Sequence, residues 1–258
     1  MIGIVGGVGP AAGADLLSKI TEETAAHKDQ EHLPVLLYSL PHRIVDRTAF
    51  LEGKEFQNPG INLAEICLNM EASGVCVAGI PCNTAHAAPI FSRLEEELKK
   101  ANSQLTLVHL IHENINYLHG KFKKGSRIGV LSTTGTFEQK IYSSHLEAAG
   151  YACILPDADM QKELVHTAIY HPSYGIKSVG RRITDLSKAQ LYHVMDLMKK
   201  QGAEAIILGC TEIPLAITEN EYKGMLLIDA TRVLARAMIR HYDAQKLKED
   251  EMLEAFQS

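Results

Sequence analysis

The sequence predicts an α/β protein with two similar parallel-sheet domains, related by a pseudo-twofold axis and holding the functional site in the cleft between them. Short apolar runs alternate with segments of helical periodicity along the chain, which is typical of parallel sheets with helical crossovers. An apolar strand with glycine at its second position occurs at residues 2–5 and again at 128–131. Cys82 and Cys210 recur at nearly the same spacing, and the order of elements between these landmarks is shared, so we infer a duplicated α/β unit.

The first half opens with an apolar strand at residues 2–5, a turn rich in glycine, and a helix at 11–20. Residues 41–60 carry cations and proline without clean periodicity, which predicts a long loop of the kind that often serves a site. The same periodicities predict the remaining elements of this half: strands at 34–40, 74–80 and 105–110, and helices at 61–72 and 84–100.

The second half repeats this pattern, with a turn of small residues at 132–136 and a loop at 171–180. Its predicted elements are strands at 127–131, 153–155, 205–208 and 226–228, and helices at 137–149, 160–169, 188–201 and 232–242. We expect one domain to hold residues 1–104 plus 222–258, and the other to hold residues 105–221.

The composition excludes several classes of protein. Hydrophobic residues make up 46% and charged residues 22% of the 258 residues, as in soluble globular proteins. The chain shows neither an apolar run of membrane-spanning length nor a signal-peptide pattern, so we expect a cytoplasmic protein without membrane contact. The net charge of -5 comes without a long run of Lys or Arg, which argues against nucleic acid as a partner. Five cysteines without C-x-x-C spacing predict neither a disulfide framework nor a metal site.

Two of these cysteines stand where chemistry is expected. Cys82 and Cys210 each follow a predicted strand and precede a predicted helix start, and ligands of parallel sheets bind at that edge. Facing edges would place the two thiols across one cleft. Unpaired N–H groups at a helix start lower a thiol pKa, which suits a base or a nucleophile. Two thiols on opposite sides of one carbon are what a two-base inversion requires.

A carbanion formed beside a carboxylate also needs hydrogen-bond donors aimed at the carboxylate oxygens. Asn83, Thr84, Thr211 and the turn at 133–136 offer an amide, hydroxyls and N–H groups in the right region. Threonines at helix starts are otherwise ordinary N-caps, and we expect some of these to be caps.

Six motifs together resemble a known family. The chain is similar to the cofactor-independent aspartate/glutamate racemase superfamily, and most closely to its aspartate racemase branch, from residue 1 to about residue 240. That resemblance implies two similar α/β domains with the site between them, a homodimer, and no pyridoxal phosphate, metal or other cofactor. The motifs that carry it are Gly6-Gly7-Val8-Gly9-Pro10, Asp46-Arg47-Thr48-Ala49, Pro81-Cys82-Asn83-Thr84-Ala85-His86, Thr133-Thr134-Gly135-Thr136, Gly175-Ile176-Lys177 and Gly209-Cys210-Thr211-Glu212-Ile213.

The resemblance also implies roles for individual residues. Cys82 and Cys210 match the two catalytic bases, and the substrate is a small amino acid, with a dicarboxylic one favoured. Arg can grip a carboxylate with two hydrogen bonds, which fits such a ligand. The matched substrate-binding positions are Asn83 and Thr84 for the α-carboxylate, Arg47 and Lys177 for the distal carboxylate, and Ala85, Thr134, Thr136 and Thr211 in the cleft.

Two departures from the family pattern weaken the prediction of substrate. Val8 stands where methionine is common in the family turn, and the segment 170–175 is longer than in close relatives. Glutamate, a broader range of amino acids, or a related acid acted on by an isomerase or decarboxylase therefore remain open. The cysteine pair favours racemisation over a one-thiol decarboxylase.

Three readings from other classes compete. The segment 7–12 fits the G-x-G-x-x-A pattern of dinucleotide-binding proteins, but the second predicted strand runs into Pro41 and His42, without the expected acidic residue. A thiol hydrolase could pair Cys82 with His86, which would leave Cys210 without a role. A non-catalytic protein that binds acidic ligands could use the same scaffold, although both thiols argue against it.

Overall fold

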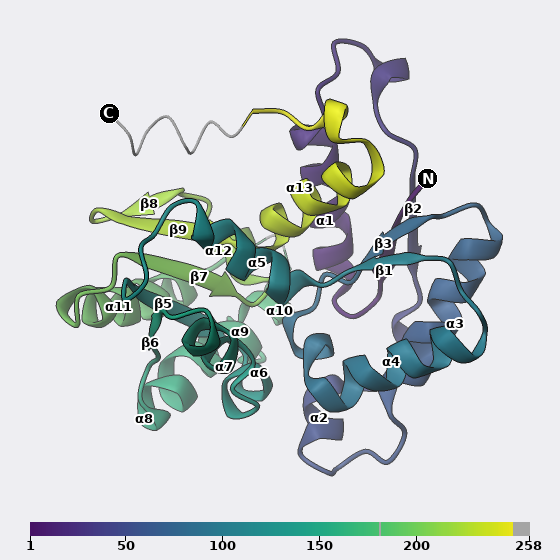
Figure 1. Ribbon diagram of the computed structural model, residues 1–258. Helices are drawn as coiled ribbons and strands as arrows, with labels where there is room; N and C mark the ends of the chain where they lie inside the picture. The colour runs from purple at the N-terminus through teal and green to yellow at the C-terminus, as the bar shows by residue number, and fades with distance from the viewer. Residues whose placement is uncertain (181, 250–258) are drawn as a thin grey trace.

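The computed structural model describes residues 1–180 and 182–249, which form two β-sheets with helices around and between them (Figure 1). The first sheet has the strand order β2-β1-β3-β4, and the second has the order β6-β5-β7-β9-β8. The strands are β1 (Ile2–Gly6), β2 (Val35–Ser39), β3 (Val77–Gly79), β4 (Thr106–Val108), β5 (Arg127–Ser132), β6 (Ala152–Ile154), β7 (Ala205–Gly209), β8 (Glu221–Tyr222) and β9 (Met225–Asp229).

Both sheets are parallel except for the last edge strand. In the first sheet Ile4 pairs with Leu37 and Gly79 on either side, and in the second Gly129 pairs with Ile154 and Ile206. Among the strands of the described residues, only β8 runs antiparallel, against β9. The order β2-β1-β3-β4 in one sheet is therefore repeated as β6-β5-β7-β9 in the other. This repetition confirms the predicted pair of parallel-sheet units.

The helices fall into long ones that cover the sheets and short ones near their edges. The long helices are α1 (Pro10–Glu23), α3 (Pro59–Ala72), α4 (Ala88–Lys100), α5 (Leu110–His119), α7 (Ile141–Ala148), α11 (Asp185–Lys200) and α13 (Ala230–Asp243). The short helices are α2 (Arg47–Leu51), α6 (Thr134–Glu138), α8 (Ala158–Met160), α9 (Thr167–Tyr170), α10 (Ile176–Val179) and α12 (Ile213–Ala216). A π-helical segment (Gln161–His166) joins α8 to α9, and 3-10 turns occupy Asp29–Glu31, Pro41–Arg43, Asn83–His86 and Ala244–Lys246.

Alternating side chains divide the interior into three apolar clusters. On β1, Ile2 and Ile4 point into a central cluster shared by both sheets, and Val5 points into a cluster on the outer side of the first sheet. On β7, Ile207 joins the central cluster and Ile206 joins the outer cluster of the second sheet. This is the two-residue alternation of a strand covered on both faces. The central cluster joins the two halves into one core.

Two helices cross from one half to the other. Helix α13 follows β9 of the second sheet but packs against α1 and over β3 of the first half. Helix α5 follows β4 of the first sheet and packs against α7 of the second half. The strands do not cross, because β4 pairs with β3 and β9 pairs with β7. The expected boundaries at residues 104 and 222 therefore assign these two strands to the wrong sheets.

Several predicted elements differ from those observed. The predicted loop at 41–60 contains α2, because the Asp46 side chain caps it by accepting the Ala49 N–H at 2.8 Å. The predicted helix at 84–100 is a 3-10 turn followed by α4, since Ala87 is extended and Pro89 favours a new helix start. The helix predicted at 137–149 is split into α6 and α7 by Lys140, which has φ 51°. Helix α5 was not predicted.

A buried ion pair anchors the crossing helix α13. Asp229 at its N-cap accepts the N–H groups of Thr231 and Arg232 at 2.9 and 3.1 Å. Its other carboxylate oxygen lies 2.6 Å from Nζ of Lys19 on α1, whose side chain is only 6% exposed. Lys19 also pairs with Asp15. The contact ties the end of the second sheet to a helix of the first half.

We expect Asp229→Ala to lower the free energy of unfolding by about 2–4 kcal/mol, because it removes a helix cap and one partner of a buried ammonium. The control is Asp196→Ala, which breaks an ion pair of the same 2.6 Å length with the exposed Lys223 and should cost less than about 1 kcal/mol. Chemical denaturation of both variants measures the difference. Equal losses would contradict the anchoring role of Asp229.

Candidate functional site

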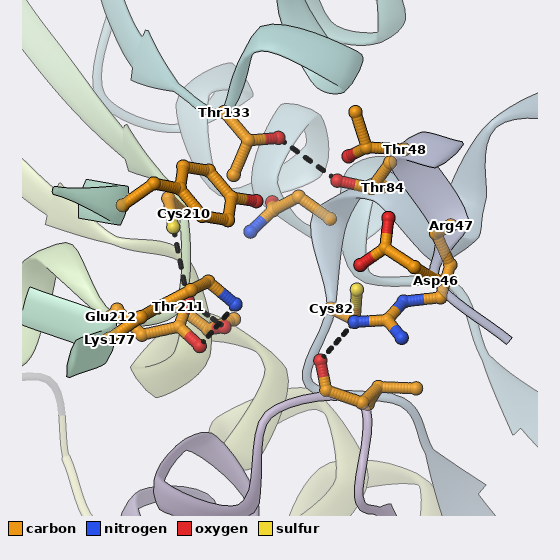
Figure 2. A pocket seen from close by; sticks show the side chains of 13 residues that line it. Asp46, Arg47, Thr48, Cys82, Thr84, Thr133, Lys177, Cys210, Thr211 and Glu212 are labelled. Carbon is orange, nitrogen blue, oxygen red and sulfur yellow. Dashed lines mark hydrogen bonds and ion pairs between the residues drawn. The ribbon is translucent and has the colours of Figure 1, made fainter. Parts of the chain in front are cut away.

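Cys82 and Cys210 line the same pocket, between the carboxyl ends of the two sheets. Cys82 follows β3 and occupies the N-cap position of the 3-10 turn Asn83–His86 without a side-chain capping bond, while Cys210 directly follows β7. Figure 2 shows the two sulfur atoms on opposite sides of the pocket, each presented by a different half of the molecule. The cavity is narrow, with a volume of about 20 Å³, enough for about one water molecule.

Seven of the ten predicted site residues line this pocket, and three do not. Those that line it are Cys82, Cys210, Arg47, Asn83, Thr84, Lys177 and Thr211. Ala85 is fully buried in the apolar cluster outside the first sheet. Thr134 lies in a neighbouring cavity with its hydroxyl 2.9 Å from Nδ1 of His166. Thr136 is 2% exposed and acts behind the pocket wall, as described below.

A buried cluster of threonine hydroxyls supports the wall formed by Thr84. Thr84 Oγ1 lies 3.0 Å from Oγ1 of Thr133 and 3.1 Å from Oγ1 of Thr136. Thr133 caps α6, and its hydroxyl accepts the Thr136 N–H. These bonds join the Cys82 segment of the first half to the turn of the second half. The cluster thus fixes the two halves of the pocket relative to each other.

Two glycines let the halves approach closely. A Cβ on Gly135 would lie 2.8 Å from Oγ1 of Thr48, where α2 of one half meets α6 of the other. A Cβ on Gly9 would lie 2.6 Å from Oε1 of Glu212. The glycine-rich turn therefore leaves room for a carboxylate that approaches from across the cleft. This close approach explains the glycines of the turn without requiring a bound dinucleotide.

On the Cys82 side the neighbouring charge is a guanidinium. Arg47 Nη2 donates to the Val8 carbonyl at 2.7 Å, and Nη1 donates to the Val45 carbonyl at 3.3 Å. Its Nε is buried and has no hydrogen-bond partner among residues 1–180 and 182–249. Burial alone would lower the pKa of Arg47, but the Cys82 sulfur and Asp46 more than offset it and raise the pKa. The guanidinium is thus held in place with one donor free.

On the Cys210 side the neighbouring charge is a carboxylate. Cys210 Sγ donates to Oε2 of Glu212 at 3.1 Å, and Lys177 Nζ lies 2.9 Å from Oε1 of the same carboxylate. Burial and the Glu212 charge raise the pKa of Cys210 well above its ordinary value, although Lys177 opposes them. The lowered pKa expected from a helix start is therefore wrong for Cys210. Burial beside a carboxylate outweighs the effect of a four-residue helix.

Asn83 offers a second free donor, oriented by a residue that sequence reasoning missed. Tyr142 on α7 donates its hydroxyl to Oδ1 of Asn83 at 2.6 Å. Burial raises the pKa of Tyr142, so the phenol keeps this proton. Nδ2 of Asn83 is buried without a partner in the described part of the chain. An unsatisfied buried donor costs about 1–3 kcal/mol, so a ligand oxygen there would be favoured.

Other pocket residues were also missed as site residues. Asp46, Thr48, Tyr170 and Glu212 all line the pocket, as does Val8 at the wall where a departure was noted. In the sequence, Glu212 and Asp46 are adjacent to predicted site residues in the motifs quoted above. This adjacency was the only sequence feature that could have indicated that they line the site. Tyr142 and Tyr170 lie on helices whose local sequence contains no motif that indicates a functional site. Within residues 1–180 and 182–249, no group of three His, Cys, Asp or Glu side chains is arranged to hold a metal ion.

His86 is not placed to act as a base for Cys82. Its Nδ1 lies 2.8 Å from the Cys82 carbonyl, which can only accept, so Nδ1 carries the proton. The Leu110 N–H donates to Nε2 at 3.2 Å, so that nitrogen is unprotonated. Both nitrogens are used by the backbone, and burial lowers the pKa of His86 to about 4. The geometry therefore disfavours a Cys82–His86 hydrolase dyad.

The neutral state of His86 has a consequence for stability. An unfolded histidine takes up a proton near its ordinary pKa of 6.5, whereas folded His86 does so only near pH 4. This residue therefore costs nothing above pH 6.5, and its penalty grows to about 3 kcal/mol as the pH falls toward 4. We expect His86→Gln to reduce the loss of unfolding free energy over this range, measured by urea denaturation. An unchanged pH slope would contradict the lowered pKa of His86.

None of the helices in the described ranges combines the length and apolar character that crossing a membrane requires.

Comparison with known proteins agrees with this geometry. A family model described as Asp/Glu/Hydantoin racemase matches residues 5–238. The broad specificity amino-acid racemase RacX of Bacillus subtilis (strain 168) is 26% identical over 250 residues, which cover 94% of this chain and 98% of that protein. Picrophilus torridus aspartate racemase superposes with a TM-score of 0.76 at 26% identity, covering 96% of this chain and 95% of its own. An aspartate racemase homologue from Pyrococcus horikoshii OT3 shares the fold, with a TM-score of 0.69, 20% identity, and coverage of 93% and 97%.

The matched region includes Cys82, Cys210 and the strands that precede them. The resemblance inferred from the motifs is thereby confirmed, and the chain belongs to the Asp/Glu/hydantoin racemase family.

Proposed function

We propose that the protein is an amino-acid racemase that inverts Cα by proton transfer between Cys82 and Cys210, with aspartate as the favoured substrate. The main support is the position of the two sulfurs, which line one pocket from opposite halves. One sulfur takes the proton from Cα while the other supplies a proton to the opposite face. The electron pair between these steps spreads into the substrate carboxylate, which requires donors aimed at its oxygens.

Two free donors support a carboxylate ligand. Asn83 Nδ2 and Arg47 Nε are both buried, line the pocket and lack partners among the described residues. We assign Asn83, together with Thr84 and Thr211, to the α-carboxylate. Arg47 is the cation available to a side-chain carboxylate. The homodimer and the absence of a cofactor remain predictions from the resemblance.

A broader substrate range is the second candidate, and one contact favours it. Lys177, expected to bind the distal carboxylate, already pairs with Glu212, so its charge is not free for a ligand. Asp46 likewise places a negative group at the pocket beside Arg47. The pocket thus balances its cations with anions, which suits zwitterions without a second carboxylate. The similarity to the broad-specificity RacX points the same way.

The function is tested by incubating L-aspartate, L-glutamate and neutral L-amino acids with the protein in deuterium oxide. We expect D-aspartate carrying deuterium at Cα, detected by chiral chromatography and mass spectrometry. Cys82→Ala and Cys210→Ala should each lower the rate by at least about 100-fold, because each removes one proton-transfer group. Cys76→Ala, which alters an exposed thiol outside the pocket, is the matched control.

If no amino acid exchanges its α-hydrogen, the racemase proposal is wrong. Full activity in either active-site variant would exclude the two-thiol scheme. Faster turnover of neutral amino acids than of aspartate would select the broader range.

Tyr142→Phe tests how the donor on Asn83 is oriented. Without the phenol, the amide can rotate and its Oδ1 loses its partner, so we expect kcat/KM to fall about tenfold. Tyr151→Phe is the control, because its hydroxyl donates to the Phe122 carbonyl at 3.4 Å, away from the pocket. Steady-state racemisation by both variants, at equal thermal stability, measures the effect. A kcat/KM within twofold of the parent would contradict this role of Tyr142.

A further inference from the structure

The two thiols of the pocket have unlike neighbours. A carboxylate, Glu212, accepts a hydrogen bond from Cys210. Cys82 lies beside the Arg47 guanidinium, and no carboxylate accepts a hydrogen bond from it among residues 1–180 and 182–249. Figure 2 shows Cys210 bonded toward Glu212 on one side and Cys82 next to Arg47 on the other. The duplicated fold therefore places sulfur at equivalent positions but surrounds each sulfur with a different charge.

Glu212 is held in one position by three partners from the second half. Its Oε2 accepts from Cys210 Sγ at 3.1 Å and from Thr211 Oγ1 at 3.3 Å, while Oε1 pairs with Lys177 at 2.9 Å. The missing side chain of Gly9 leaves room for Oε1 from the opposite half. Glu212 is only 5% exposed, so water does not replace these partners. Burial would raise the pKa of Glu212, but Lys177 and the hydrogen bonds lower it, so the carboxylate stays ionised.

We propose that Glu212 is a positioning residue that keeps the proton on Cys210 in the free protein, so that Cys210 enters the reaction as the proton donor. An ionised carboxylate can only accept, and the bond at 3.1 Å therefore needs a protonated sulfur. The protonation state belongs to the free protein, whereas its use in catalysis rests on the racemase function proposed above.

The proton balance of the reaction follows from this assignment. The reaction then requires a thiolate at Cys82, which takes the proton as the Cα–H bond breaks, and the bonding electrons move into the substrate carboxylate. The electrons return as a new Cα–H bond forms on the opposite face with the proton of Cys210. Cys82 then holds a thiol and Cys210 a thiolate, with Lys177 as the compensating cation. Racemisation of the opposite enantiomer starts from this second state, in which Cys82 is a thiol and Cys210 is a thiolate. One proton must therefore move from one sulfur to the other before the reaction can run in the opposite direction.

The groups facing Cys210 act in opposite directions. Burial raises its pKa most, Glu212 raises it further, and Lys177 of α10 lowers it. The phenols of Tyr142 and Tyr170, from α7 and α9, also interact electrostatically with the Cys210 sulfur. Burial raises the pKa of both phenols and keeps them neutral. Removing Glu212 or Lys177 should therefore move the titration of Cys210 in opposite senses. A loss of packing alone would not produce that pair of shifts.

The test follows the Cβ resonance of Cys210 by NMR as a function of pH, in full-length protein carrying isotope-labelled cysteine and no substrate. The resonance is assigned by its loss in Cys210→Ala. We expect Glu212→Gln to lower the titration midpoint by at least about one pH unit, and Lys177→Gln to raise it. Glu163→Gln, which removes an exposed carboxylate outside the pocket, should leave it unmoved.

An unmoved or raised midpoint in Glu212→Gln overturns the proposal, as do shifts of the same sign in both variants. If Glu212→Gln fails to fold, the titration of Cys210 in the unsubstituted protein is the test. A midpoint below the ordinary thiol pKa of about 8.5 would also overturn the proposal. No substrate is present, so these outcomes are independent of the racemase assay. Activity without the expected shifts would refute only the role of Glu212, and shifts without activity would refute only the racemase function.

Discussion

The meeting of two parallel sheets at their carboxyl ends is the constraint on which the site depends. A pocket cysteine follows each of β3 and β7, and the common pocket exists only while these two edges stay opposed. Three features keep them there: the central apolar cluster, the crossing helices α5 and α13, and the bonded threonines across the cleft. The Lys19–Asp229 pair belongs to the same scaffold, since it fastens the start of α13 to the first half.

Duplication supplies symmetric positions, and the surrounding residues then make the site asymmetric. On the Cys82 side, Arg47 donates to backbone carbonyls and its Nε has no partner among the described residues. On the Cys210 side, Glu212 and Lys177 form an ion pair with each other. In the proposed mechanism, this arrangement lets one sulfur hold a proton while the other accepts one. It also leaves the small pocket close to neutral in charge. If the proposed mechanism holds, the same asymmetry bears on both the direction of proton transfer and the choice of substrate.

Much of this architecture could be predicted from the sequence because it is locally encoded. The alternation of apolar residues located the strands, and their ends located Cys82, Asn83 and Cys210. Contacts between distant segments could not be predicted in this way. The pKa of Cys210 depends on burial and on the orientation of Glu212, and Thr134 and Thr136 lie beside the pocket rather than in it because of how α6 turns its hydroxyls. Tyr142 reaches Asn83 only through the packing of α7.

The central claim is that both sulfurs address one carbon, and a crystal structure with bound aspartate measures this most directly. The account expects Cys82 Sγ and Cys210 Sγ on opposite faces of Cα, each within about 3.5 Å, with a substrate carboxylate on Nδ2 of Asn83. A complex in which either sulfur points away from Cα, or in which both lie on the same face, would contradict it.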